Sequence, residues 1–147
     1  MKIIALYATR NRGKTTTLNK LIDLLSLVAG YYEINRAGET CAYFEINGKG
    51  VTVCTPGDNE EAIKANIKFF MNKEHKKDVL VTASHKWGET VNEINAFTDK
   101  KKADLVWVKK VDDESKNALI AAGLLGLVRK EVYPEFDDAV QPAEGNQ

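Results

Sequence analysis

The residues best suited to chemistry are Gly13, Lys14 and Thr15, which lie between a short apolar run and a segment with helical periodicity. They end a pattern, G-x-x-x-x-G-K-[ST], in which backbone amides and a lysine hold phosphates and a hydroxyl binds Mg²⁺. Gly13 lets the backbone approach an anion, and Lys14 supplies a mobile positive charge. A helix that begins here adds free N–H groups and its positive dipole end. These residues therefore predict a phosphate site.

The stretch from Ala8 to Thr15 resembles the Walker A loop of P-loop NTPases, with Ala8 in place of the first glycine. The resemblance implies binding of ATP or GTP with Mg²⁺ as cofactor, Thr15 as a metal ligand and Lys14 as a catalytic residue. The residues expected to bind the nucleotide are Thr9, Arg10, Asn11, Arg12, Gly13, Lys14, Thr15 and Thr16. Arg10 and Arg12 either clamp phosphate oxygens or are simply the basic residues of a loop.

A second stretch, Cys54-Thr55-Pro56-Gly57, is similar to the element that follows the hairpin in Ras-like and translational GTPases. Cys54 stands where that family has an acid that holds Mg²⁺ through water. Asp58 comes shortly afterwards and is the candidate to replace that acid, as a metal ligand and catalytic residue. The alternative is that Asp58 or Asn59 caps the helix that follows.

A third stretch, Lys109-Lys110-Val111-Asp112, matches three of the four positions of the Asn-Lys-x-Asp guanine signature and lacks the Asn. The resemblance implies that Asp112 contacts the base, whereas Asp112 or Asp113 capping a helix is the alternative. The incomplete signature leaves the choice between ATP and GTP open. Thr40 lies where those GTPases place a threonine that senses the γ-phosphate.

The loop from Ser84 to Thr90 offers further polar groups at the end of a predicted central strand. His85 is a candidate to orient water, Lys86 to neutralise an acid and Trp87 to stack on a base. A plain turn followed by a helix is the alternative interpretation. His75 lies in a lysine-rich segment and is expected on the surface.

The composition indicates a globular protein without a strong charge bias. Basic and acidic residues number 21 each, so the formal net charge is zero and nucleic-acid binding is not implied. Cys41 and Cys54 lack metal-ligand spacing and are expected to be reduced core residues of a cytoplasmic protein. No apolar run approaches the ~20 residues of a membrane span, and the first residues do not resemble a signal peptide.

Apolar periodicity and turn residues predict one domain over residues 1–133, followed by a flexible acidic tail over 134–147. Residues 31–39 are expected to be irregular, and Asn47-Gly48 to be the turn of a β-hairpin. The expected strands are 2–8, 40–47, 51–54, 78–83 and 105–108. The expected helices are 15–29, one capped by Asp58 or Asn59 with an apolar face from Ile63 to Met71, 89–98 and 112–130.

The order of these elements predicts an α/β fold: a three-layer α/β/α arrangement similar to P-loop NTPases. Its sheet is expected to have five mostly parallel strands, with one antiparallel hairpin strand. Ligands of such sheets bind beyond the carboxyl ends of the strands. The chain is thus expected to be a Mg-dependent NTPase. A non-hydrolysing nucleotide-binding or interaction module, with an unknown protein partner, and a small-molecule kinase are the alternatives.

Overall fold

The computed structural model describes residues 1–8, 13–35 and 40–135, and it confirms the α/β class. The strands are β1 (Lys2–Ala8), β2 (Tyr31–Asn35), β3 (Cys41–Ile46), β4 (Lys49–Cys54), β5 (Val79–His85) and β6 (Asp104–Lys109). The helices are α1 (Lys14–Val28), α2 (Glu60–Phe70), α3 (Glu89–Lys101), a short 3-10 helix η1 (Glu114–Lys116) and α4 (Asn117–Val132).

The strands form one mixed sheet in the order β2-β3-β4-β5-β1-β6. The neighbours β4, β5, β1 and β6 are parallel, whereas β3 is antiparallel to both β2 and β4. The prediction of five strands was therefore wrong: the described chain forms six, and the sheet has two antiparallel pairs at one end. The strand β5 lies between β1 and β4, so its carboxyl end separates the ends of those two strands.

The missed strand is β2, which lies within the segment predicted to be irregular. It pairs with β3 from Tyr31 opposite Glu45 to Asn35 opposite Cys41. Four of its five residues are exposed, so it lacks the alternation of buried and exposed positions that marks a strand in sequence. Pairing with β3, rather than burial, thus gives this segment its structure.

The predicted hairpin is confirmed between β3 and β4. Asn47 and Gly48 both have positive φ, 52° and 76°, which is the conformation that a two-residue turn of type I′ requires. The hairpin places Phe44 opposite Val51 in the buried part of the sheet.

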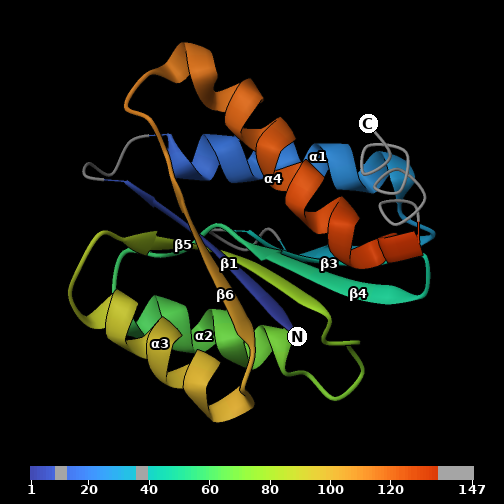
Figure 1. Cartoon of the computed structure of the whole chain (residues 1–147), viewed down its shortest axis with the longest axis horizontal. Coiled ribbons are helices and arrows are strands. Elements are labelled where there is room, and N and C mark those ends of the chain that lie inside the picture. Colours follow the sequence, from blue (N-terminus) through green and yellow to red (C-terminus); the bar gives the residue numbers. More distant parts are fainter. Residues whose placement is uncertain (9–12, 36–39, 136–147) are drawn as a thin grey trace, which may run out of the picture.

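Helices cover both faces of the sheet, with α1 and α4 on one face and α2 and α3 on the other (Figure 1). On the first face, α1 buries Leu18, Leu21, Ile22 and Leu25, four of the five positions that its helical periodicity predicts. The fifth, Val28, is 59% exposed at the end of the helix, so that part of the prediction was wrong. On the second face, Ile63 and Phe70 of α2 meet Ile94 and Phe97 of α3. The two helix layers cover the faces of the sheet, and the loops that follow the strands lie at its edges.

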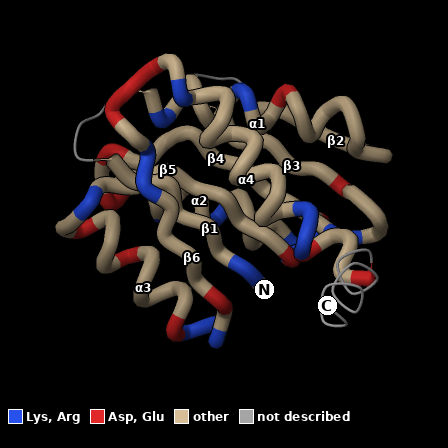
Figure 2. Tube along the Cα trace, turned by 45° about the horizontal axis from the view of Figure 1, so that its top comes forward, with Lys and Arg blue, Asp and Glu red and all other residues tan. Residues whose placement is uncertain are grey.

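Helices α2 and α3 follow the charge pattern that a helix dipole favours. Helix α3 has Glu89 in its first turn and Lys100 and Lys101 in its last, and Figure 2 shows both signs along it. The start predicted for the last helix was wrong, because Asp113 caps the short helix η1 and α4 begins only at Asn117.

The end of the chain is described only as far as Glu135. The predicted tail, 134–147, therefore lies outside the described residues except for Pro134 and Glu135. No helix in the described ranges combines the length and the apolar character that crossing a bilayer requires.

Candidate functional site

The candidate site lies at the edge of the sheet where β4, β5, β1 and β6 have their carboxyl ends. These four strands are parallel neighbours, so the segments that follow them come together at this edge. Of the predicted nucleotide-binding residues, Thr9, Arg10, Asn11 and Arg12 lie outside the described residues. Gly13, Lys14, Thr15 and Thr16 are described and form the start of α1.

The start of α1 is a helix N-terminus without a side-chain cap. Gly13 adopts the left-handed conformation with φ of 80°, and its side-chain-free backbone leads directly into Lys14. The first intrahelical bond is donated by the N–H of Thr17 to the oxygen of Gly13, at 2.9 Å. The N–H groups of Lys14, Thr15 and Thr16 therefore precede the helical bonding pattern, and such groups are suited to bind an anion.

Lys14 connects α1 to the neighbouring strand. Its side chain is only 5% exposed, and its Nζ donates a hydrogen bond of 2.8 Å to the carbonyl oxygen of Ser84 in β5. A lysine is rarely buried this deeply unless its charge is partnered. The contact places the ammonium group at the carboxyl end of β5, as a phosphate-binding lysine requires.

Thr90 holds the loop that follows β5. Its Oγ1 accepts a hydrogen bond of 3.1 Å from the N–H of His85 and lies 3.2 Å from the hydroxyl of Ser84. The sequence places Thr90 in one predicted loop with the candidate residues Lys86 and Trp87. Trp87 is 71% exposed, and the Lys86 ammonium lies 5.7 Å from the centre of its ring. Thr90 therefore shapes the backbone here, while Trp87 presents an open aromatic face to solvent.

Asp58 follows β4 and lies beside the same loop. It lines a hollow of about 220 Å³ together with His85, Trp87 and Thr90. Of the two candidate helix caps, Asn59 is the one that caps α2, because its Oδ1 accepts a hydrogen bond of 2.8 Å from the N–H of Ala62. The exposed carboxylate of Asp58 is not used as that cap.

Cys54, which stands where the GTPase element has an acid, is fully buried. Burial raises the pKa of its thiol well above the ordinary range, so it stays uncharged at neutral pH. Thr55, next along the chain, binds backbone instead: its Oγ1 accepts from the N–H of Thr40 at 2.9 Å. Asp58 is thus the nearest carboxylate along the chain that is able to replace the missing acid.

Lys110, after β6, is a site residue whose position the sequence did not predict. It is 2% exposed, and its Nζ donates a hydrogen bond to the carbonyl oxygen of Val111. A Cβ placed on Gly13 would lie only 2.8 Å from Lys110 Cε and 2.9 Å from its Nζ. The alkyl chain of Lys110 therefore lies directly against the start of α1, and the glycine makes this approach possible.

Asp112 lies on the exposed loop beyond Lys110. The capping role that competed with base recognition belongs to Asp113, whose Oδ1 accepts from the N–H of Ser115 at 3.0 Å. Hydrogen bonds from Ser115 lower the pKa of Asp113, so its carboxylate is charged at neutral pH. Asp112 is therefore not the residue that caps η1.

Two buried lysines thus lie at the start of α1: Lys14 is its first residue and bonds the Ser84 carbonyl of β5, and Lys110, which follows β6, lies against Gly13. The two ammonium groups repel each other, and both are next to the positive end of a helix dipole, so their arrangement favours a bound anion. Within residues 1–8, 13–35 and 40–135, no group of three or more His, Cys, Asp or Glu residues is arranged to hold a metal ion. Mg²⁺ commonly binds through one or two carboxylates together with substrate phosphates, and Asp58 is an exposed carboxylate that follows β4 at this edge.

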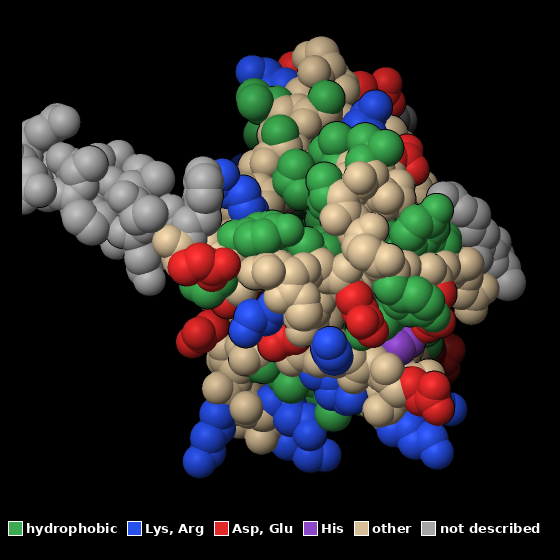
Figure 3. All heavy atoms as spheres, turned by 90° about the vertical axis from the view of Figure 1, so that its right-hand side faces the viewer, with side chains coloured by type: hydrophobic (Ala, Val, Ile, Leu, Met, Phe, Trp, Pro, Cys, Tyr) green, Lys and Arg blue, Asp and Glu red, His purple; other side chains and the backbone are tan. Residues whose placement is uncertain are grey.

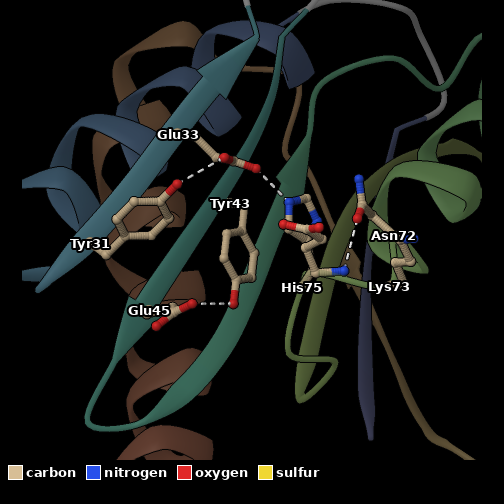
Figure 4. Close-up of a pocket in the computed structure, with 8 residues that line it drawn as sticks. Tyr31, Glu33, Tyr43, Glu45, Asn72, Lys73 and His75 are labelled. Atoms are coloured by element: carbon tan, nitrogen blue, oxygen red, sulfur yellow. Dashed lines mark hydrogen bonds and ion pairs between the residues drawn. The ribbon is translucent and has the colours of Figure 1, made fainter.

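A second hollow, of about 450 Å³, lies away from this edge, over β2 and β3 (Figure 4). Its centre is His75, predicted on the surface; the prediction was wrong, because His75 is only 6% exposed. The imidazole stacks on the ring of Tyr43 at 4.0 Å between centres. Burial raises the pKa of Tyr43 to about 12. Figure 3 shows the side of the molecule that lies on the right in Figure 1, where apolar side chains lie between charged ones.

Comparisons with protein-family models, curated proteins and solved structures give no match to this chain.

Proposed function

We propose that this protein binds a nucleoside triphosphate, ATP or GTP, together with Mg²⁺ at the start of α1, and that it hydrolyses the nucleotide slowly. We also propose that its helix-covered sheet is a P-loop NTPase-like three-layer arrangement. The observation that carries the proposal is the buried ammonium of Lys14, bonded to the carbonyl of Ser84 at 2.8 Å, at a helix start whose N-cap, Gly13, has no side chain. A buried ammonium group beside the first N–H groups of a helix is suited to neutralise phosphate oxygens.

In this mechanism the phosphates rest on the N–H groups at the start of α1. Lys14 leaves the Ser84 carbonyl for the phosphate oxygens and offsets the charge that develops on the transferring phosphoryl group. The hydroxyl of Thr15 and the carboxylate of Asp58 would hold Mg²⁺, which would neutralise charge on the phosphates. Water then attacks in line, and the leaving diphosphate keeps its bonds to the helix.

The base lies toward the loop after β6 in this arrangement. Lys110 lies against Gly13, and Asp112 comes two residues after Lys110 in the chain. Asp112 is therefore the candidate to contact the base. Because only three of the four signature positions match, the proposal covers both ATP and GTP.

A thermal-unfolding panel tests binding, with ATP, GTP, ADP and inorganic phosphate, each with and without Mg²⁺. A ligand at a hundredfold excess over its Kd stabilises the native state by about 2.7 kcal/mol. We expect such a shift for the wild type with a triphosphate and Mg²⁺, and a much smaller shift for Lys14→Ala. Lys20→Ala is the matched control, because Lys20 is an exposed lysine on the same helix and should leave the shift unchanged.

Equal shifts for the wild type and Lys14→Ala, or no shift with any triphosphate, would contradict the proposed site. Release of phosphate from the bound triphosphate, with water as the only acceptor, tests hydrolysis. Tight binding without release would identify a non-hydrolysing module. Release that requires an added hydroxyl compound would identify a kinase.

A further inference from the structure

The loop after β6 brings a second buried lysine to the start of α1, and the phosphate-binding pattern does not account for it. Lys110 is 2% exposed, and the hydrogen bond that its ammonium donates goes to Val111, the next residue in the chain. In the described part of the chain Lys110 forms no ion pair. Hydrogen bonds from Ser115 lower the pKa of the Asp113 carboxylate most, and Lys110 is near enough to lower it further, but Lys110 and Asp113 are not in direct contact. Burying an ammonium group without a directly bonded counter-charge is costly, and the positive end of a helix beside it raises that cost.

Asn117 supplies an independent observation at the same place. It is 3% exposed, and its side-chain oxygen has no hydrogen-bond partner among the described residues. This oxygen lies 3.3 Å from the position of a Cβ on Gly13, and the Lys110 Nζ lies 2.9 Å from that position. A buried polar atom without a partner is rare in native proteins, and it indicates a group that the site is built to receive or to position.

We propose that Lys110 is a second phosphate-binding lysine, and that it holds the phosphate chain from the β6 side while Lys14 holds it from the β5 side. This inference rests on the proposed function. An ammonium group has three donors: one bonds the Val111 carbonyl, a second is available to the Asn117 oxygen, and the third faces the anion beside Gly13. Asn117 becomes a positioning residue for Lys110 when its oxygen, unpartnered among the described residues, accepts this hydrogen bond.

The position of the main chain supports this role. The N–H of Lys110 donates a hydrogen bond of 2.7 Å to the carbonyl oxygen of Tyr7, so the backbone at Lys110 is fixed to β1, the strand that leads into the phosphate loop. A side chain attached to that strand needs only rotation of its own bonds to reach an anion. The neighbouring Lys109 is exposed, and its substitution removes the same charge from the protein, so it is a matched control.

The experiment measures affinity by titration calorimetry for two probes with Mg²⁺, ATP and inorganic tripolyphosphate. A hydrogen bond to a charged group contributes about 1.5–3 kcal/mol, so Lys110→Met should weaken both probes by about 10- to 100-fold. Lys109→Met should change neither by more than about twofold. Because Lys110→Met removes a buried charge beside a helix N-terminus, it should also raise the Tm of the ligand-free protein.

The outcomes separate this inference from the proposed function. If the wild type binds neither probe, the proposed function fails and this inference fails with it. If the wild type binds and Lys14→Ala does not, but Lys110→Met binds like the wild type, only the second lysine is refuted. Weaker binding of ATP alone would mean that Lys110 contacts the nucleoside, and a lower ligand-free Tm would mean a structural role; either result overturns the inference.

Discussion

His75 Nε2 lies 2.5 Å from Glu33 Oε1, and this contact joins the edge strand β2 to the segment between α2 and β5 (Figure 4). The other ring nitrogen, Nδ1, lies 3.0 Å from the carbonyl oxygen of Phe69. A carbonyl only accepts hydrogen bonds, so the network assigns a proton to Nδ1 and a further proton to the contact between His75 and Glu33. β2 is therefore held to the protein both by its pairing with β3 and by the contact between Glu33 and His75.

We predict a pH dependence of stability from this contact. Hydrogen bonds from His75 and then Tyr31 lower the pKa of Glu33 from its ordinary value of 4.5. A lowered pKa in the folded state stabilises the protein above the ordinary pKa, and this stabilisation is lost as the pH falls through the lowered value. Glu33→Gln should therefore be less stable than the wild type at neutral pH, and the difference should shrink in acid.

Urea unfolding at a series of pH values from about 7 to about 3 measures the difference in unfolding free energy between Glu33→Gln and the wild type. Glu74→Gln is the control, because Glu74 lines the same hollow without bonding the imidazole. The contact would have no stabilising role if Glu33→Gln and the wild type kept a constant difference in unfolding free energy across that range.

Asp58 and Asn59 are adjacent and should have separable roles. Asn59→Ala removes the cap of α2 and should lower the free energy of unfolding by about 1 kcal/mol, with little effect on nucleotide affinity. Asp58→Asn removes an exposed carboxylate that caps no helix, so it should leave stability within about 0.5 kcal/mol and weaken only the Mg²⁺-dependent part of nucleotide binding.

Chemical unfolding and nucleotide titrations with and without Mg²⁺ give both quantities for each variant. Equal nucleotide affinities of Asp58→Asn and the wild type in Mg²⁺ would remove Asp58 from the proposed metal site. The start of α1 would then remain as the anion site.

Gly57 and Gly123 should respond in opposite directions to the same substitution. A Cβ on Gly57 would lie 2.6 Å from the carbonyl carbon of Ala83 and 2.7 Å from its oxygen, in the backbone of β5. Gly57→Ala should therefore destabilise the protein by about 1–3 kcal/mol, because the backbone cannot yield easily. A Cβ on Gly123, inside α4, meets no atom within 4 Å, so Gly123→Ala should stabilise the protein by about 1 kcal/mol.

The Tm values of both variants, measured against the wild type, check this pair of predictions. Gly57→Ala should also weaken nucleotide binding if Asp58 holds Mg²⁺, because Asp58 follows directly. A Gly57→Ala protein as stable as the wild type would show that β4 and β5 separate readily at this edge.

The sequence by itself determined the features that depend on short-range patterns. The strand β1, the apolar face of α1 and the turn at Asn47-Gly48 follow from periodicity or from backbone conformations that few residues adopt. The α/β class follows from the order of such elements. Gly13, Lys14 and Thr15 could be singled out for the same reason, because three adjacent residues carry the pattern.

Only the tertiary structure decided which distant segments meet. The contact between Lys14 and Ser84 joins residues 70 positions apart, and it depends on β5 lying next to β1. The strand β2 has no buried face that a sequence pattern could reveal, and His75 is buried because Tyr43 and Glu33 come to it from other strands. Lys110 looks like any loop lysine until β6 pairs with β1 and brings it against Gly13. Such contacts depend on the order of strands across the sheet, which local propensities do not encode.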